Sequence, residues 1–123
     1  MERTNSRALG ERGETLALHY LKRQGLLPVE RNFRCRLGEI DLVMLDEECL
    51  VFVEVRLRTG KRLVPAAHTV DRFKQIKLGR AAEIYLAGRH AHVHRPARFD
   101  VVGIDRDVNG ELQFEWVQNA FSL

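Results

Sequence analysis

Hydrophobic residues near the start of the chain recur at intervals of three and four positions, which is the spacing of one face of an α-helix. The residues on that face are Leu9, Gly13, Leu16, Ala17, Tyr20 and Leu21. Gly25 follows them, and glycine is common just beyond the last turn of a helix. The pattern predicts a helix over residues 6–24, with Glu14 at the flank of its buried face.

Three segments with the composition of β-strands follow this helix, at residues 27–34, 38–45 and 50–57. The third is an almost unbroken apolar run, which is typical of a central strand that is buried on both faces. The stretch Asp46-Glu47-Glu48-Cys49 separates the second segment from the third and predicts the turn of a β-hairpin.

A second helix is predicted over residues 70–87, with Thr69 as its N-cap and Asp71 in its first turn. Two further strands, at residues 98–105 and 111–117, are joined through Asn109-Gly110, which is a strong signal for a hairpin turn. The order of elements is αβββαββ. It predicts an α/β fold in which helices flank a mixed central sheet.

The size and composition of the chain favour one folded domain over residues 1–123. Apolar residues make up 45% and charged residues 30% of the sequence, which excludes disorder as the default. The longest apolar runs are far shorter than the roughly 20 residues that cross a bilayer. Residues 1–10 also lack the apolar core of a signal peptide. We therefore expect a cytoplasmic protein without a membrane partner.

Positive charge is concentrated in one part of the chain. Residues 56–98 contain 11 basic and two acidic residues, although the net charge of the whole chain is only +3. Arg outnumbers Lys by 16 to 4, and the guanidinium group matches phosphate geometry. The uneven charge predicts an acidic site beside a phosphate-binding surface, whereas a genome rich in G and C would also raise the Arg content. The residues expected to bind nucleic acid are Arg58, Lys61, Arg62, Arg72, Lys74 and Lys77.

The predicted hairpin turn determines which side chains meet across the second and third strands. A tight two-residue turn pairs positions whose numbers sum to 95. Asp41 then faces Glu54 on the same side of the sheet, with Cβ atoms about 5 Å apart. In the same register, Glu39 faces Arg56.

Two opposed carboxylates inside a sheet repel each other by about 3 kcal/mol at an effective dielectric constant near 20, and a divalent cation would remove this cost. Oxygen ligands suit Mg²⁺ or Mn²⁺, and such an ion can activate water and neutralise charge on a phosphodiester. From the residues alone, the alternative is a salt-bridge ladder in which Glu39 and Glu54 pair with Arg56 or Arg58.

Several motifs in these elements resemble those of one protein family. They are GEIDLV at residues 38–43, VFVEVRLR at 51–58, GERGE at 10–14, the pair Arg31-Asn32, RFDVV at 98–102 and the closing Asn119-Ala120-Phe121. Over nearly its whole length, the chain resembles the YraN family of uncharacterised bacterial proteins. That family is similar to a small branch of the PD-(D/E)xK nucleases, so the resemblance implies a restriction-endonuclease-like fold.

The resemblance also implies roles for the acidic residues. Asp41 matches the metal-binding Asp of the nucleases, and Glu54 matches the acidic residue of their (D/E)xK element. Glu14 resembles the helix-borne acid that completes the metal site in archaeal Holliday junction resolvases. These three residues are therefore the expected ligands of Mg²⁺ or Mn²⁺ and, together with Arg56, the expected catalytic residues.

Arg56 departs from the nuclease pattern because it replaces the Lys of the (D/E)xK element. An arginine can hold water and stabilise a developing negative charge, but it stays protonated and cannot act as a base. If a proton must be exchanged, Lys74 and Lys77 are candidates, since both project from the mostly apolar side of the second predicted helix. The alternative for each is a lysine whose stem covers apolar surface while its charge reaches water.

The leading hypothesis is a nucleic-acid-binding protein of nuclease fold that acts as a Mg²⁺- or Mn²⁺-dependent endonuclease on branched or structured DNA. The replacement by Arg56 supports an alternative, a non-catalytic module that keeps the fold and binds nucleic acid or a protein partner. A third hypothesis is a basic regulatory subunit of a larger enzyme. Symmetric cleavage of a junction by so short a chain would require a homodimer.

Overall fold

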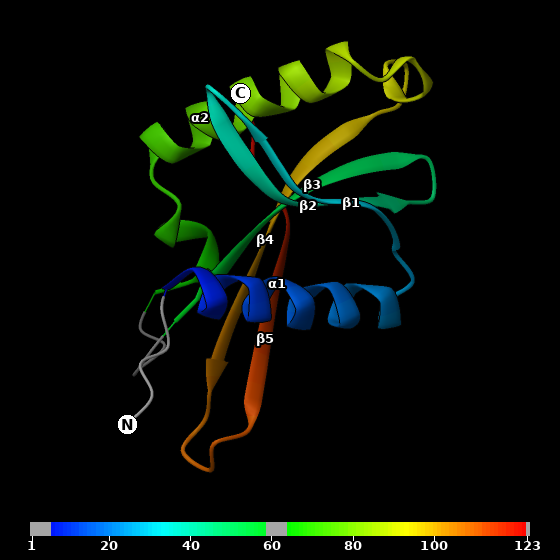
Figure 1. Ribbon diagram of the computed structural model, residues 1–123. Helices are drawn as coiled ribbons and strands as arrows, with labels where there is room; N and C mark the ends of the chain where they lie inside the picture. Colours follow the sequence, from blue (N-terminus) through cyan, green and yellow to red (C-terminus); the bar gives the residue numbers. More distant parts are fainter. Residues whose placement is uncertain (1–5, 59–63, 123) are drawn as a thin grey trace.

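Five strands form one mixed sheet, and two α-helices cover its opposite faces (Figure 1). The computed structural model describes residues 6–58 and 64–122. The elements are α1 (Ser6–Arg23), β1 (Leu27–Cys35), β2 (Gly38–Asp46), β3 (Cys49–Leu57), η1 (Ala66–Thr69), α2 (Arg72–Ala87), η2 (His90–His92), β4 (Ala97–Arg106) and β5 (Leu112–Phe121). The predicted order αβββαββ is confirmed, and two short 3-10 helices, η1 and η2, are added to it.

The strands lie in the sheet in the same order as in the chain, β1-β2-β3-β4-β5. Three of the four neighbouring pairs are antiparallel, and β3 and β4 are parallel. A parallel pair needs a crossover connection, and α2 supplies it by packing on one face of the sheet on the way from β3 to β4. The sheet is therefore mixed, as the sequence predicts.

Each face of the sheet has its own hydrophobic core, and β3 contributes to both. Phe52 packs with Leu78 and Tyr85 on the α2 face. The next residue along the strand, Val53, packs with Leu21 on the α1 face. This double burial explains the unbroken apolar run of β3, because side chains of a strand point alternately to its two faces.

The regular alternation of side chains fails in β2 at Asp41. Ile40 belongs to the core on the α2 face, although Leu42, two positions later, belongs to the core on the α1 face. The paired positions of β2 and β3 also end at Leu42 and Val53. Beyond that point β2 continues beside β1 alone, and β3 continues beside β4. Asp41 thus lies where two neighbouring strands separate.

Two glycines bring the helices close to this part of the sheet. A Cβ at Gly38 would lie 2.9 Å from the backbone oxygen of Lys77, so β2 can approach α2 there only without a side chain. A Cβ at Gly13 would lie 2.8 Å from Cδ2 of Leu57, which shows a similarly close contact between α1 and β3. Both helices therefore pack closely against the part of the sheet where β2 and β3 separate.

The N-cap of α2 differs from the prediction. Oδ1 of Asp71 accepts a hydrogen bond from the backbone N–H of Lys74 at 2.8 Å, which makes Asp71 the cap, so the assignment of Thr69 was wrong. Thr69 ends η1 instead, and its hydroxyl donates to the carbonyl of Ala66 at 2.6 Å. Two residues separate Thr69 from the first residue of α2. Asp71 directly precedes the helix, so its short side chain is the one that reaches the first turn.

The final strand is longer than predicted because a buried carboxylate holds its irregular end. Asp100 is fully buried and accepts hydrogen bonds from Nε of Arg98, Nε1 of Trp116 and the backbone N–H of Asn119, each at 2.9 Å. Asn119 has a positive φ of 50°, and the pairing of β4 with β5 shifts nearby. The strand thereby continues through this irregularity to Phe121.

Substitutions of two glycines should change stability in opposite directions. Gly38→Ala should lower the free energy of unfolding by about 1–3 kcal/mol, because the new methyl group would overlap the backbone of Lys77. Gly10→Ala should raise it by up to about 1 kcal/mol, since Gly10 lies within α1 and a Cβ there meets nothing within 4 Å. Urea denaturation of both variants measures these changes, and two shifts of the same sign would contradict the packing described here.

Candidate active site

Acidic side chains from three elements meet at the edge where β2 and β3 separate. Glu14 comes from α1, Asp41 from β2 and Glu54 from β3. A pocket of about 240 Å³ opens onto this edge and is lined by Gly10, Glu14, Asp41, Val55, Arg56 and Leu57. A second pocket, of about 220 Å³, shares Glu14 and Asp41 and is also lined by Asn32 and Lys74. Glu14 and Asp41 therefore line both pockets, whereas Glu54 lines neither.

The predicted register of the acidic hairpin is confirmed over its paired part. Positions that sum to 95 face each other from Asp46 and Cys49 to Leu42 and Val53. One step further, Oδ2 of Asp41 accepts a hydrogen bond from the backbone N–H of Val55 at 2.8 Å. The Asp41 side chain thus takes a place that a main-chain carbonyl would fill in a continued ladder.

The prediction that Glu39 faces Arg56 is wrong. Glu39 lies opposite Arg34 of β1, and Nε of Arg34 is 3.4 Å from its carboxylate. The prediction assumed that β2 and β3 stay paired along their whole length, whereas only residues 42–46 of β2 pair with β3. Glu39 therefore belongs to the β1–β2 hairpin and does not face Arg56, although its charge adds to the rise in the pKa of Asp41.

Burial determines the electrostatics of the acidic group. Glu14 and Glu54 are 8% and 5% exposed. Burial raises the pKa of Glu54 to about 7, with a further rise from the charge of Asp41 and a hydrogen bond to it. The pKa of Glu14 is also raised to about 7, by burial first and then by the charge of Asp41. Burial likewise raises the pKa of Asp41, although its bond from Val55 opposes the change.

A hydrogen bond joins the carboxyl groups of Glu54 and Asp41. It raises the pKa of Glu54 and lowers that of Asp41, so within this pair it favours the proton on Glu54. One oxygen of Glu14, Oε1, is buried without a hydrogen-bond partner, and the guanidinium of Arg31 lies 3.9 Å from it. The group therefore has unused capacity for a cation or a proton.

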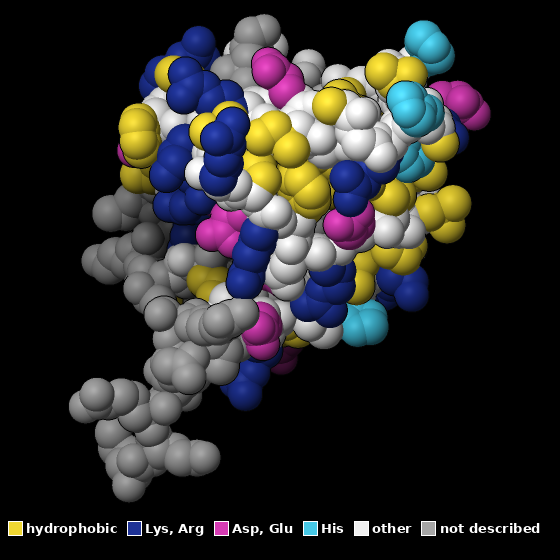
Figure 2. All heavy atoms as spheres, turned by 45° about the horizontal axis from the view of Figure 1, so that its top comes forward, with side chains coloured by type: hydrophobic (Ala, Val, Ile, Leu, Met, Phe, Trp, Pro, Cys, Tyr) yellow, Lys and Arg dark blue, Asp and Glu magenta, His cyan; other side chains and the backbone are white. Residues whose placement is uncertain are grey.

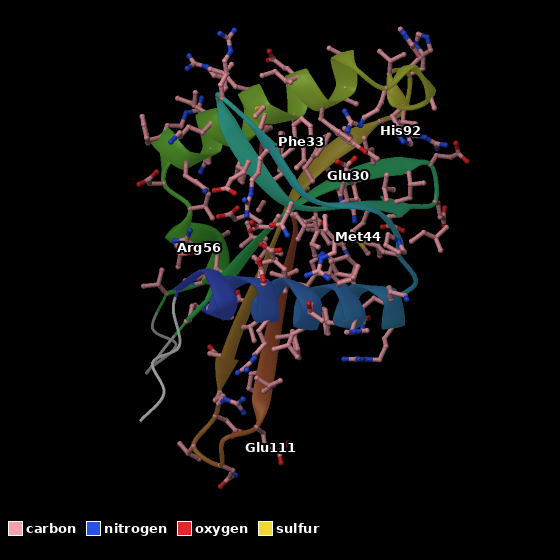
Figure 3. All side chains as sticks on the ribbon, in the orientation of Figure 1. Glu30, Phe33, Met44, Arg56, His92 and Glu111 are labelled. Carbon is pink, nitrogen blue, oxygen red and sulfur yellow. The ribbon has the colours of Figure 1, made fainter. Side chains whose placement is uncertain are left out.

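The guanidinium group of Arg56 is held in place by two neighbours. It donates to the hydroxyl of Thr69 at 3.1 Å and to the carbonyl of Thr69 at 2.9 Å. A third bond, of 3.3 Å, joins it to Oε2 of Glu54. Figure 3 shows Arg56 at the end of the sheet that faces the start of α1. Arg56 thus links Glu54 to the end of η1, and its charge stays beside the pocket.

The two lysines named as candidates for proton exchange differ in position. Nζ of Lys74 lies 3.7 Å from Oε2 of Glu54, and Lys74 lines the second pocket. Nζ of Lys77 lies 5.2 Å from the centre of the Phe73 ring on the outer side of α2. The structure therefore brings Lys74 into the candidate site and leaves Lys77 outside it.

The donor set suits a hard divalent cation. Carboxylate oxygens are the protein ligands that Mg²⁺ and Mn²⁺ prefer, and Mg²⁺ usually keeps several waters. Among residues 6–58 and 64–122, no three His, Cys, Asp or Glu side chains are arranged to hold a metal ion together. Asp41 and Glu54 thus fit as a pair of ligands to a hydrated ion. The role of Glu14 as a third ligand stays a prediction.

Among the described residues that were expected to bind nucleic acid, Arg58 is not part of the exposed basic surface. Arg58 is largely buried, with its guanidinium 3.0 Å from Glu115 and 3.4 Å from Asp105. Lys61 and Arg62 lie outside the described residues. Arg72 is exposed at the start of α2. Of the basic residues in the 56–98 segment, those paired with acids from other elements also include Arg89, Arg95 and Arg98.

The exposed positive charge comes partly from residues that the sequence reasoning missed. Figure 2 shows Lys and Arg side chains gathered at the upper left of the molecule, over α2 and the β1–β2 hairpin. The exposed basic residues of these elements are Arg31, Arg34, Arg36, Arg72, Lys77 and Arg80. The sequence signal that could have identified this basic surface is the pair Arg34 and Arg36, which flank Cys35 next to a predicted turn.

The fold and the site together define a mixed α/β protein with buried carboxylates at the point where two sheet strands separate. This chain belongs to the uncharacterised protein family UPF0102, whose profile matches residues 13–104. The matched range contains all three acidic residues, Arg56 and Lys74. It confirms the resemblance to the YraN family. Within the described residues, no helix combines the length and apolar character needed to span a membrane.

Relatives that are named only as UPF0102 proteins match most of this chain. The Alcanivorax borkumensis protein is 48% identical over 112 residues, which cover 91% of this chain and 90% of the relative. The Nitrosococcus oceani protein is 44% identical over 123 residues, or 100% of this chain and 98% of the relative. A protein of Janthinobacterium is 45% identical over 118 residues, covering 96% and 90%.

The raised pKa values of Glu14 and Glu54 predict that the metal-free protein loses stability as the pH rises. Both folded-state pKa values, about 7, exceed the usual 4.5, so the folded protein binds more protons between these values. The free energy of unfolding should therefore fall from about pH 4.5 to about pH 7, by up to roughly 1.4 kcal/mol per pH unit for each group. Urea denaturation in chelator at several pH values measures the slope.

Glu54→Gln provides the control, because its amide can still donate to Asp41 without becoming charged. The variant should be more stable than wild type at pH 8, close to it at pH 5, and less dependent on pH. Destabilisation of Glu54→Gln at pH 8 would instead support a structural role for the ion pairs that Glu54 makes with Arg56 and Lys74.

Proposed function

We propose that this protein is a metal-dependent nuclease, which hydrolyses phosphodiester bonds with Mg²⁺ or Mn²⁺ bound by Asp41 and Glu54. The observation that carries the proposal is the meeting of carboxylates from three elements, two of which line an open pocket, with the cations of Arg56 and Lys74 beside them. Structural ion pairs do not require a cluster of acids with raised pKa values, whereas functional sites often contain one. The proposal includes the fold: we propose that the mixed sheet and its two helices have the restriction-endonuclease-like topology that the family resemblance implies.

The residues of the chain have separable roles in this reaction. Asp41 is positioned by its bond from the Val55 N–H and, with Glu54, binds the metal ion. When bound, the ion supplies charge neutralisation and a more acidic water. Arg56, fixed by Thr69, stabilises negative charge that develops on the phosphate group.

Lys74 supplies what Arg56 lacks. A lysine amine can release and accept a proton, whereas a guanidinium group cannot at ordinary pH. Lys74 and Arg56 approach the same oxygen of Glu54, Lys74 from α2 and Arg56 from two positions further along β3. We therefore assign Lys74 to hold the attacking water and to exchange its proton, the task of the Lys in the (D/E)xK element.

The substrate class follows from the surface around the pocket. Exposed Arg and Lys side chains on α2 and the β1–β2 hairpin favour a polyanion, which we propose to be branched or structured DNA. One chain offers a narrow footprint, so paired cuts in a junction would need a homodimer.

A second candidate function is favoured by the contacts of Arg56. Three hydrogen bonds engage its guanidinium group, and a side chain held in this way stabilises the fold whether or not a reaction takes place. The candidate is a module that binds nucleic acid or a protein partner without cleaving it. It differs from the nuclease in having no turnover on any nucleic acid.

Metal binding and cleavage should depend on the same two carboxylates. Mn²⁺ at about 100 times its dissociation constant should stabilise wild type by about 2.7 kcal/mol relative to chelator, and should leave Asp41→Asn and Glu54→Gln nearly unchanged. Asp41→Asn should abolish cleavage of four-way, flap, single-stranded and duplex DNA while retaining binding, because a negative charge beside phosphate is removed. Thermal melts and a gel assay measure both, and equal Mn²⁺ responses in all three proteins would refute the metal site.

The division of roles between Lys74 and Arg56 predicts different losses. Lys74→Met and Lys74→Arg should both reduce cleavage about a hundredfold, since proton exchange is lost even when the charge is kept. Arg56→Lys should retain or raise activity, because only a cation is needed there. Lys22→Met, the same change at an exposed position near the end of α1, is the matched control. A wild type that is inert on every substrate while Arg56→Lys turns over would establish the binding module.

A further inference from the structure

The outer side of α2 exposes an aromatic ring in basic surroundings. Phe73 is 70% exposed and Ile76, one turn later, is 36% exposed. Phenylalanine is among the residues most often buried, so a ring this open needs an explanation. Arg72, Lys77 and Arg80 on the same helix are exposed as well, and none of them forms an ion pair with a described residue. Their charges are therefore available to a ligand.

The β1–β2 hairpin extends this surface. A Cβ at Gly38 would meet the backbone of Lys77 first, so the hairpin adjoins α2 at the residue whose ammonium group lies over the Phe73 ring. Arg36 and Leu37 of that turn are exposed. Figure 2 shows the resulting concentration of Lys and Arg over both elements, with apolar side chains among them.

Phe73 directly precedes Lys74, which is a residue of the candidate active site. Its neighbour Lys74 reaches Glu54, and successive side chains of a helix point about 100° apart. A polynucleotide that leaves the pocket over the first turn of α2 would therefore meet the Phe73 ring. Nζ of Lys77 lies 5.2 Å from the ring centre, where it can also contact the phosphate of a nucleotide stacked on the ring.

We propose that Phe73 is a stacking platform for an unpaired base, and that Arg72, Lys77 and Arg80 bind the flanking phosphates. The inference rests on the proposed function and specifies its substrate as nucleic acid with a single-stranded segment beside the cleavage site. Aromatic rings stack on bases of any sequence, whereas the bases of an intact duplex are already stacked on one another. The surface therefore selects unpaired structure without selecting sequence.

A second copy of the chain fits this surface less well. In a symmetric dimer through α2, each copy would place Arg72, Lys77 and Arg80 against the same residues of its partner. Like charges brought together in an interface cost several kcal/mol, and the exposed large apolar side chains of α2 are only Phe73 and Ile76 among the described residues. A polyanion, in contrast, complements both the ring and the charges around it.

The test measures binding of a fluorescent single-stranded oligonucleotide and of a duplex of equal length in chelator, so that neither metal nor cleavage affects the result. Phe73→Ala should weaken binding of the single strand about tenfold or more and leave duplex binding nearly unchanged. Phe73→Trp should keep the affinity, and fluorescence of the added indole should be quenched by the single strand only. Val108→Ala, at a fully exposed position in the β4–β5 turn, is the matched control and should change neither affinity.

The salt dependence separates the ring from the charges. Phe73→Ala should keep the slope of log affinity against log salt concentration, whereas Lys77→Met should make it shallower by about one phosphate contact. Wild-type affinity in Phe73→Ala, equal losses on both substrates, or reduced self-association with unchanged nucleic-acid binding would each overturn the proposal. Circular dichroism melts verify that the variants fold.

The two proposals fail in distinguishable ways. If Phe73→Ala binds and cleaves like wild type in Mn²⁺, the nuclease remains and the stacking platform is refuted. If the single strand depends on Phe73 but no substrate is cleaved in Mn²⁺, the platform remains and the hydrolytic function is refuted. Absence of binding to every nucleic acid would overturn both.

Discussion

The candidate site depends on one constraint, which is that β2 and β3 pair only from Leu42 to the hairpin turn and are separated at Asp41. β3 must pair with β2 on one side and, in parallel, with β4 on the other, while β2 follows β1 away from it. At the point of separation the N–H of Val55 lacks a β2 carbonyl, and the Asp41 carboxylate accepts its hydrogen bond instead. Asp41 is thus held by the sheet itself, and its acidic neighbours are fixed relative to it.

Gathering three carboxyl groups, two of them buried, works against folding, and the surrounding contacts reduce that cost without removing it. Lys74 and Arg56 approach Glu54, and Arg31 approaches Glu14. Burial still dominates, since the pKa values of both glutamates remain raised. Such unfavourable arrangements persist in proteins chiefly where they serve a function. The arrangement itself therefore supports a site selected for binding a cation.

The sequence predicts the parts of the site that depend on local geometry. The register of the acidic hairpin follows from a two-residue turn, so the meeting of Asp41 and Glu54 could be anticipated. The position of Glu39 could not, because alternation assumes strands that stay paired. The distribution of charge along the chain was also a poor guide to the exposed basic surface, because tertiary contacts decide which charges stay exposed. Acids from distant strands neutralise Arg58 and Arg89, and no local pattern reveals which basic residues find such partners.

The agreement between strand order and chain order has a consequence for how the site assembles during folding. Every neighbouring pair in the sheet except β3 and β4 joins consecutive antiparallel strands, and contacts of short sequence separation form fastest. Asp41 and Glu54 therefore meet within a hairpin that is complete in itself. The cation of Lys74 arrives only when the long crossover through α2 closes. The meeting of Asp41, Glu54 and Arg56 is thus encoded locally, whereas the addition of Lys74 from α2 and Glu14 from α1 depends on the whole topology.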